Sequence, residues 1–377
     1  MTKILLFEEK YDKQSRILKA VFPGKYLQGS GLLNELPNLI ELFGLRGMII
    51  ASKSVNKNIL PHLQTEHKRI SIVFEEFGGE CSDKEINRLQ KVVLEKNIEV
   101  LIGMGGGKVI DTAKIVADKL NIPVIIFPTI ASTDAPCSGV AVVYSDEGVF
   151  DYVYYLKLNP QIVAVDMDII AKAPVRFLIA GIGDALATRF EAEACYRANS
   201  KNECGGYGTL TALSLAQLCY NTIVKYGELA VAANKNNVVT DALNHVVEAN
   251  TLLSGLGFES AGLAAAHSIH NGFSALSPTR NYYHGEKVAF GTLVGLHLSD
   301  AEPELISEVY SFCKKIGLPT TLKQIGLENV TKDDLIKVAI KTCAPAESIH
   351  HEVGEITPDK VLSAIIVADE MGKWFNW

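Results

Sequence analysis

The chain has 377 residues, of which 48% are hydrophobic and 21% charged, and its formal net charge at pH 7 is −7. This length predicts two domains, each large enough for its own hydrophobic core. The composition is typical of a soluble globular protein. The acidic balance and the scattered lysines exclude a basic surface for nucleic acid or for an anionic membrane.

The sequence also bears on targeting and on the redox state of the cysteines. The N-terminal run MTKILLFEEKYDKQ has too short an apolar stretch for a secretory signal. No window approaches 18 uninterrupted apolar residues, so we expect no membrane span. The cysteines form no CxxC pair, which predicts reduced thiols in a cytoplasmic protein; they stand at positions 81, 137, 195, 204, 219, 313 and 343.

The first half of the chain, up to about residue 170, alternates short β-rich runs with amphipathic helical stretches. This alternation predicts a parallel sheet covered by helices on both faces. In one of the helices we expect Asp83 to be the N-cap and Ile86, Leu89, Val93 and Leu94 to form the apolar face. The predicted strands span residues 46–51, 70–77, 99–103, 124–128, 140–145 and 162–166.

After Pro174 the sequence shows only helical periodicity. We therefore predict an α/β domain over residues 1–172 and an all-helical domain over 173–377. No flexible linker separates them, so we expect a ligand cleft between two rigidly packed domains. The helices of the second domain are expected to break at 202–208, 254–258, 274–281 and 316–321.

The segment EVLIGMGGGKVIDTAKIVADKL (99–120) predicts a buried strand, a glycine turn and a helix. Because Gly105, Gly106 and Gly107 lack side chains, phosphate oxygens can approach the backbone at the positive end of the helix. It is not a Walker loop, since Val109 follows the lysine, and Lys108 breaks a strict GxGxxG pattern. The pattern favours a pyrophosphate, with an unliganded glycine turn as the alternative.

A second polar loop, FPTIASTDAPCSG (127–139), follows the next predicted strand. Ligands of open α/β sheets bind at the carboxyl edge, where this loop is expected to lie. An ordinary turn built around Asp and Pro is the alternative interpretation. The polar side chains in the loop are those of Thr129, Ser132, Thr133, Asp134 and Ser138.

Three residues of the second half suggest a metal site. Asp184 is expected at the start of a helix, His267 on a helix of small residues and His284 at the start of another helix. One carboxylate and two imidazoles leave coordination positions open, as a catalytic zinc requires. For each histidine, a hydrogen-bonded core residue is the alternative.

Taken together, these motifs resemble the glycerol dehydrogenases of the metal-dependent polyol dehydrogenase group, which is related to iron-type alcohol dehydrogenases and dehydroquinate synthases. The resemblance runs from about residue 24 to residue 372. It implies a Rossmann-like α/β domain followed by an all-α domain, with a zinc ion in the cleft. It also implies homo-oligomers, often octamers. The motifs are GGGKVIDTAK, PTIASTDAPCS, GIGDALAT, ANTLLSGLGFES, GLAAAHSIHNG and HGEKVAFGTL.

The resemblance also implies roles for individual residues. Asp184, His267 and His284 would be the metal ligands, and Thr188 stands where iron-type relatives have a further histidine. Asp134 would accept a hydroxyl of the polyol. His270 would support the metal site or take the substrate proton, with plain packing as the alternative. The cofactor would contact Gly105, Gly106, Gly107, Lys108, Thr129, Ser132, Ser138, Val140 and Tyr144.

The implied reaction is the reversible oxidation of glycerol, or a related 1,2-diol, to dihydroxyacetone with hydride transfer to NAD. The sequence differs from the family pattern at the cofactor site. Ser52 stands where family members have an acidic residue that holds the adenosine ribose, and Lys53 follows it. Without that carboxylate nothing repels the 2′-phosphate of NADP, so the site could bind NADP as well as NAD.

Two alternatives remain open, a lyase like dehydroquinate synthase and a non-catalytic paralogue. Arg189, Arg280 and Lys287 form no basic cluster in the sequence, which disfavours the phosphate-carrying substrate of the lyase.

Overall fold

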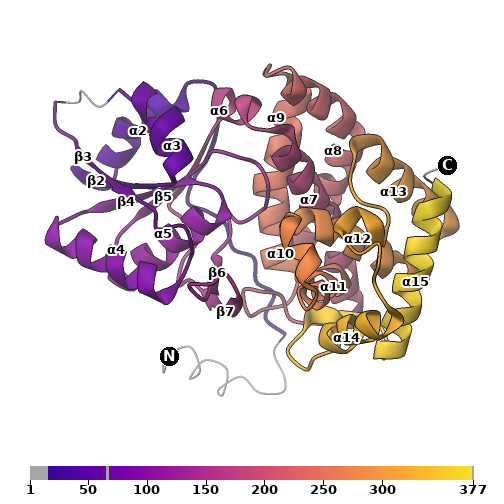
Figure 1. The fold of residues 1–377 in the computed structure, drawn as a ribbon. Coiled ribbons are helices and arrows are strands. Elements are labelled where there is room, and N and C mark those ends of the chain that lie inside the picture. Colours follow the sequence, from indigo (N-terminus) through magenta and orange to yellow (C-terminus); the bar gives the residue numbers. More distant parts are fainter. Residues whose placement is uncertain (1–15, 65–67, 376–377) are drawn as a thin grey trace.

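A computed structural model describes residues 16–64 and 68–375 of the chain (Figure 1). The run MTKILLFEEKYDKQ, considered above as a targeting signal, lies outside the described residues. In the described part, the N-terminal half contains a parallel sheet with strand order β1-β8-β5-β4-β2-β3. Its strands are β1 (Tyr26–Gly29), β2 (Arg46–Ala51), β3 (Ser71–Glu76), β4 (Val100–Gly105), β5 (Val124–Pro128) and β8 (Ile162–Asp166).

Helices cover both faces of this sheet, as the continuous apolar strands require. Along β2, Met48 and Ile50 pack on the face covered by α4 (Asp83–Glu95) and α5 (Gly107–Leu120). The alternate residue Ile49 packs on the opposite face, against α2 (Leu32–Glu41) and α3 (Lys53–Asn58). The predicted parallel sheet between helical layers is therefore confirmed.

Several local predictions were wrong. Ser82, not Asp83, caps α4, because its hydroxyl accepts the backbone N–H of Glu85. Leu94 is 64% exposed, since it lies beyond the face formed by Ile86, Leu89 and Val93. The run 140–144 forms β6 (Val140–Tyr144), which does not enter the parallel sheet but pairs antiparallel with β7 (Phe150–Tyr155), a strand that the sequence analysis missed.

The second half of the chain is helical. The predicted boundary at residue 172 falls between α6 (Met167–Lys172) and α7, and it stays a prediction. An expected break at 254–258 was wrong, because those residues lie in α10. The helices of this half are α7 (Val175–Ala198), α8 (Leu210–Lys235), α9 (Asp241–Glu248), a π-helix (Ala249–Leu253), α10 (Ser254–Ala261), α11 (Ala265–Phe273), α12 (His284–Leu298), α13 (Pro303–Ile316), α14 (Lys332–Thr342), α15 (Pro358–Phe375) and 3₁₀ turns at Ser277–Asn281, Leu322–Ile325 and Ser348–His351. A further 3₁₀ turn, Leu60–His62, follows α3 in the first half.

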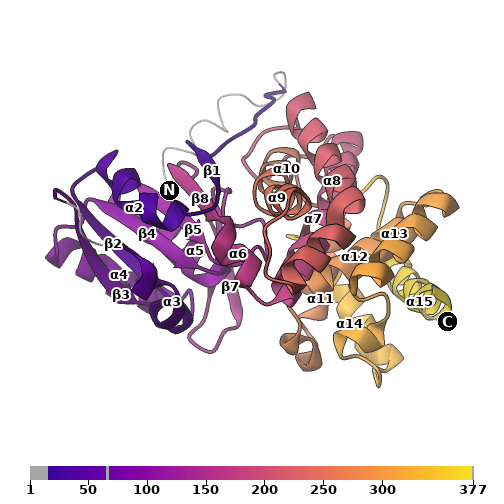
Figure 2. The same ribbon diagram turned by 90° about the horizontal axis from the view of Figure 1, so that it is seen from above.

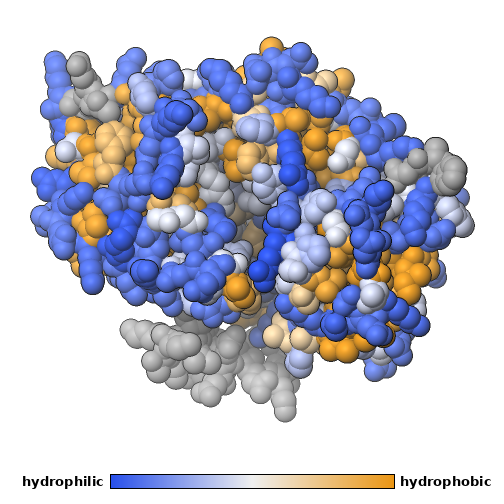
Figure 3. Space-filling view, in the orientation of Figure 1, coloured by the Kyte–Doolittle hydropathy of each residue, from blue (hydrophilic) through white to orange (hydrophobic). Residues whose placement is uncertain are grey.

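The two halves lie side by side, with α7 and α10 of the helical half next to the α/β half (Figure 2). The surface between them is hollowed in the space-filling view (Figure 3). Hydrogen bonds join the halves at the loop 129–139; among them, Asn250 donates to the carbonyl of Ala131, and Ser254 donates to the Asp134 carboxylate. The π-helix and α10 thus hold the polar loop of the first half against the second.

All seven cysteines are free thiols, and five of them are buried, in agreement with the reduced state expected from the sequence. Among the described residues, no helix has both the length and the apolar composition to cross a bilayer.

Candidate metal and cofactor site

Glycines bring three segments together at the junction of the two halves. A side chain at Gly181 would come within 2.0 Å of the carbonyl oxygen of Ala131, and one at Gly285 within 1.8 Å of the carbonyl oxygen of Ala180. The loop 129–139 and the start of α12 can therefore pack directly on the backbone of α7. This contact explains why Asp184 lies in the middle of α7; its predicted place at a helix start was wrong, because the glycines before it serve packing and do not end the helix.

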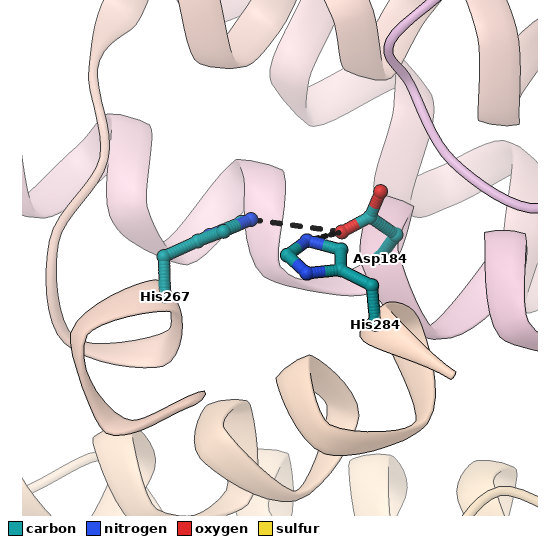
Figure 4. Close-up of side chains that lie close together, drawn as sticks. All are labelled: Asp184, His267 and His284. Carbon is teal, nitrogen blue, oxygen red and sulfur yellow. Dashed lines mark ion pairs between the residues drawn. The ribbon is translucent and has the colours of Figure 1, made fainter. Parts of the chain in front are cut away.

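The side chains of Asp184, His267 and His284 point toward one another (Figure 4). Asp184 Oδ1 lies 3.1 Å from His284 Nε2 and 3.6 Å from His267 Nε2. One ligand atom from each of the three residues lies within 4.8 Å of the other two. Ligands about 2.1 Å from a tetrahedral zinc are roughly 3.4 Å apart, so the spacing suits such an ion. Asp184 Oδ1 is also buried without a hydrogen-bond partner, as expected of an atom that serves a metal.

The charges of this cluster shift one another's pKa values. Burial by itself would raise the pKa of Asp184, but the imidazoles of His284 and His267 outweigh burial and lower this pKa. Burial would lower the pKa of His267, but the carboxylates of Glu191 and Asp184 outweigh it and raise that pKa well above its ordinary value. The site therefore carries an ionised carboxylate, which suits a cation.

Glu191 is a residue of this site that the sequence analysis missed. It is buried, and its Oε2 lies 2.6 Å from Nδ1 of His267. A signal was present, since Glu191 follows Asp184 by two turns of α7 and so lies on the same helix face.

His270, the second histidine of the segment HSIH (267–270) in α11, lies against the proposed metal ligand His284. Its Nε2 is 3.2 Å from Nδ1 of His284, and its Nδ1 is 3.1 Å from Oδ1 of Asn271. Burial first, and then the neighbouring His284, lower the pKa of His270 well below its ordinary value. A neutral His270 can accept a hydrogen bond from the Nδ1–H of His284.

Asp134 lies at the edge of the cluster. Its backbone N–H is 3.3 Å from Asp184 Oδ2, and its side chain accepts a 2.8 Å hydrogen bond from the Ser254 hydroxyl. Burial and the nearby Asp184 charge raise the pKa of Asp134 well above its ordinary value. The Thr188 hydroxyl lies 2.8 Å from that of Ser254, so the side chain at this position joins the Asp134 network.

The glycine loop lies beside the loop 129–139. The Thr129 N–H donates to the carbonyl of Gly105, and Gly107 faces the hydroxyl of Thr133. Gly106 caps α5 without a side chain, so the first N–H groups of that helix are exposed to a ligand at the carboxyl edge of the sheet.

Lys108 and Tyr144 flank this turn. The Lys108 ammonium lies 2.6 Å from a Glu80 carboxylate oxygen and 5.3 Å from the centre of the Tyr144 ring. The strand β6, which carries Val140 and Tyr144, is thereby held next to the glycine loop.

Lys114, a second residue that the sequence analysis missed, anchors the loop 129–139. Its side chain is fully buried, and its ammonium donates to the carbonyls of Ala135, Ser138 and Val140. Asp111 lies 3.3 Å from the same ammonium. Ser138 belongs to the same hydrogen-bond network, since its hydroxyl donates to the carbonyls of Ala135 and Val140. Ser132 is half-buried in the loop.

Ser52 follows β2, the strand next to β4 and its glycine turn, and it stands at the N-cap position of α3 without a side-chain hydrogen bond to that helix. The exposed Lys53 beside it lies 3.9 Å from the exposed Glu76 carboxylate at the end of β3. The predicted ribose position thus lies next to the predicted phosphate position, with Ser52 where the resemblance expects a carboxylate and Lys53 beside it.

Comparisons with known proteins agree with this architecture. Residues 23–167 match the family of iron-containing alcohol dehydrogenases. A glycerol dehydrogenase of Thermotoga maritima is 50% identical over 358 residues, which cover 95% of this chain and 98% of that protein. One of Escherichia coli O6:H1 is 47% identical, with coverage of 94% and 97%. The crystal structure of glycerol dehydrogenase from Schizosaccharomyces pombe is similar with a TM-score of 0.91 and 38% identity, and covers 97% of this chain and 93% of that one. The chain belongs to the iron-containing alcohol dehydrogenase family, within the group that contains the glycerol dehydrogenases.

Proposed function

We propose that this protein is a zinc-dependent glycerol dehydrogenase, which reversibly oxidises glycerol and related 1,2-diols to dihydroxyacetone or the corresponding ketone and transfers the hydride to NAD. The observation that carries the proposal is the convergence of one carboxylate and two imidazoles at the junction of the two halves. Relatives with the same name align over nearly the whole chain.

Asp184, His267 and His284 would hold the metal ion. A bound Zn²⁺ would supply Lewis acidity, which lowers the pKa of a substrate hydroxyl. Three protein ligands leave room for substrate, as in catalytic zinc sites. Thr188 supports zinc over iron, because its hydroxyl lies against Ser254 and it offers no third imidazole as a fourth ligand.

Asp134 would accept a second hydroxyl of the polyol and so orient the carbon that loses hydride. Ser254 holds its carboxylate, and the Asp134 backbone lies beside Asp184, so a substrate at the cation would reach both. His270 would orient His284, because its Nε2 faces Nδ1 of that residue. A role of His270 in taking the substrate proton is therefore disfavoured.

The cofactor would lie along the carboxyl edge of the sheet. Its pyrophosphate would bind at the N-terminus of α5, and Tyr144 would border the nicotinamide half of the cleft. We favour NAD, while Ser52 and Lys53 admit NADP because they present no carboxylate to repel a 2′-phosphate. The residues proposed to contact the cofactor are Ser52, Gly105, Gly106, Gly107, Lys108, Thr129, Ser132, Ser138, Val140 and Tyr144.

The alternative of a lyase acting on a phosphate-carrying substrate receives little support. Arg189, one of the cations considered for that role, pairs with Glu193 at 3.0 Å and lies over the Tyr220 ring. Its charge is therefore engaged on α7 and with α8.

The test is to purify the protein, together with Asp184→Ala and His267→Ala variants, and measure zinc content and oxidation of glycerol with NAD or NADP. We expect about one zinc per chain in the unaltered protein, loss of activity with a chelator, and loss of both metal and activity in the variants. Normal zinc content and turnover in the variants would refute the metal assignment. Lyase activity without net NAD reduction would favour the alternative. A homo-oligomer, for which light scattering is the direct measurement, is also proposed.

A further inference from the structure

One buried carboxylate lies behind the proposed metal ligand His267. Glu191 is 1% exposed, and its Oε2 lies 2.6 Å from Nδ1 of the His267 ring. Its other oxygen, Oε1, accepts the backbone N–H groups of Ala264 and of His267 itself, both at 3.0 Å. A single side chain on α7 therefore contacts both the first turn of α11 and the imidazole that α11 carries.

This arrangement selects one tautomer of His267. An ionised carboxylate only accepts hydrogen bonds, so the close Glu191 oxygen requires a proton on Nδ1. In the neutral ring with its proton on Nδ1, the other nitrogen, Nε2, carries the lone pair, and it is the nitrogen that faces Asp184 at 3.6 Å. A histidine binds a metal ion through a nitrogen without a proton.

We propose that Glu191 is a positioning residue for the metal site: it fixes the tautomer and the ring orientation of His267 so that Nε2 is directed at the metal. The proposal rests on the proposed function, because it assumes that Asp184, His267 and His284 bind the ion. Carboxylates behind metal-bound histidines commonly raise metal affinity about 10- to 100-fold.

A purely structural role can be separated from this one, because the chain offers a matched control. Glu352 is a half-buried glutamate that packs against the start of α11, where its Oε1 accepts the N–H of Ala265 at 3.2 Å. Both glutamates thus cap the same helix, whereas the bond to the His267 ring belongs to Glu191. Loss of capping alone should affect the two variants alike.

The experiment compares Glu191→Gln with Glu352→Gln in the full-length protein. In E191Q the amide oxygen can still accept the two backbone N–H groups, but the amide nitrogen then donates to Nδ1 of His267. That contact moves the ring proton to Nε2, where it blocks the metal. Metal affinity is measured by zinc competition with a chromophoric chelator, and coordination geometry by the visible absorption of the Co²⁺-loaded protein.

We expect E191Q to bind zinc about 10- to 100-fold more weakly, with altered Co²⁺ bands, and E352Q to match the unaltered protein. E191Q with unaltered affinity and unaltered bands would overturn the inference, as would equal losses in both variants. Should E191Q not fold, Glu191→Asp withdraws the carboxylate from the ring by one methylene; weakened zinc binding is expected, and unchanged binding overturns the inference. If the unaltered protein and His267→Ala bound zinc equally, the proposed function itself would fail.

Discussion

Asp184 Oδ1 and His284 Nε2 lie 3.1 Å apart, and the carboxylate is buried with that oxygen lacking a hydrogen-bond partner. A buried, ionised carboxylate is costly unless charge and hydrogen bonds compensate it. Two imidazoles compensate it in part, and a divalent cation at the same place would complete the compensation.

The first prediction concerns stability with and without metal. Because the ligands come together only in the folded chain, zinc should stabilise the folded state; 100-fold and 1,000-fold excesses over Kd would add about 2.7 and 4.1 kcal/mol to the free energy of unfolding. Differential scanning fluorimetry of metal-free protein with increasing zinc should show a rising Tm. His284→Ala should lose this rise, and a persistent rise would place the ion elsewhere.

A second prediction concerns Lys114, whose ammonium fastens the loop that carries Asp134. Replacement by Met fills similar space but leaves Asp111 unpaired in a buried position, so we expect K114M to lose about 3–5 kcal/mol of stability and to raise KM for the polyol. Urea denaturation and steady-state kinetics measure the two effects. Lys119→Met, at an exposed position on the same helix, is the control and should change stability by less than about 0.5 kcal/mol. A K114M protein as stable as this control would mean that the buried lysine contributes nothing.

The strand–helix alternation of the first half could be predicted from the sequence because both faces of its central strands are buried. Ile49 and Ile50 pack on opposite faces, so the strand appears as an unbroken apolar run. The edge strand β1 has four half-buried residues and no such run, and β7 is partly exposed along its length. β1 pairs with β8, which is distant in the chain, so local patterns do not reveal this pairing. β7 pairs with the nearby β6, but its exposed residues interrupt the apolar run that marks a buried strand.

Motifs predicted the proposed metal ligands, but the sequence analysis missed the buried residues behind them. Asp184 was expected at the start of a helix, whereas Gly181 before it lies inside α7 and allows the Ala131 carbonyl to approach the helix. Glu191 and Lys114 have the charge typical of solvent-exposed helix positions, and both are buried. What a charged side chain faces is decided by elements that pack against it, so the sequence of its own helix does not show it.

A third prediction addresses cofactor choice at Ser52. A carboxylate at this position would accept ribose hydroxyls of NAD and repel a 2′-phosphate. Ser52→Asp should therefore favour NADH over NADPH by about 1.5–3 kcal/mol, roughly 10- to 100-fold. Aspartate is also a good helix N-cap, so α3 should be retained. Titration of nicotinamide fluorescence gives both Kd values.

The control for Ser52→Asp is a change at the neighbouring cation, Lys53. Lys53→Ala should weaken NADPH binding and leave NADH binding nearly unchanged, whereas Lys57→Ala, exposed farther along α3, should alter neither. An unchanged NADH/NADPH ratio in S52D would mean that the ribose does not lie at this end of β2.

A fourth prediction concerns the pKa of Glu352. Burial raises this pKa most, the hydrogen bond from the Ala265 N–H lowers it, and the charge of Glu191 raises it further. The pKa therefore rises from its ordinary 4.5 to about 7. Below pH 4.5 the side chain is neutral in both folded and unfolded chains. Between pH 4.5 and 7 the folded chain binds the extra proton, so stability falls as pH rises, and above pH 7 the loss is complete. At about 1.4 kcal/mol per pKa unit, the loss is at most ~3 kcal/mol.

Glu352→Gln cannot ionise and should escape this loss. Relative to the unaltered protein, its stability in urea should differ little at pH 4.5 and be higher by up to ~3 kcal/mol at pH 8. Glu355→Gln, an exposed change in the same segment, should show no such pH-dependent difference. If the gain of E352Q were the same at both pH values, the effect would come from packing and not from ionisation of the buried carboxyl, because only ionisation makes the difference grow as the proton is lost.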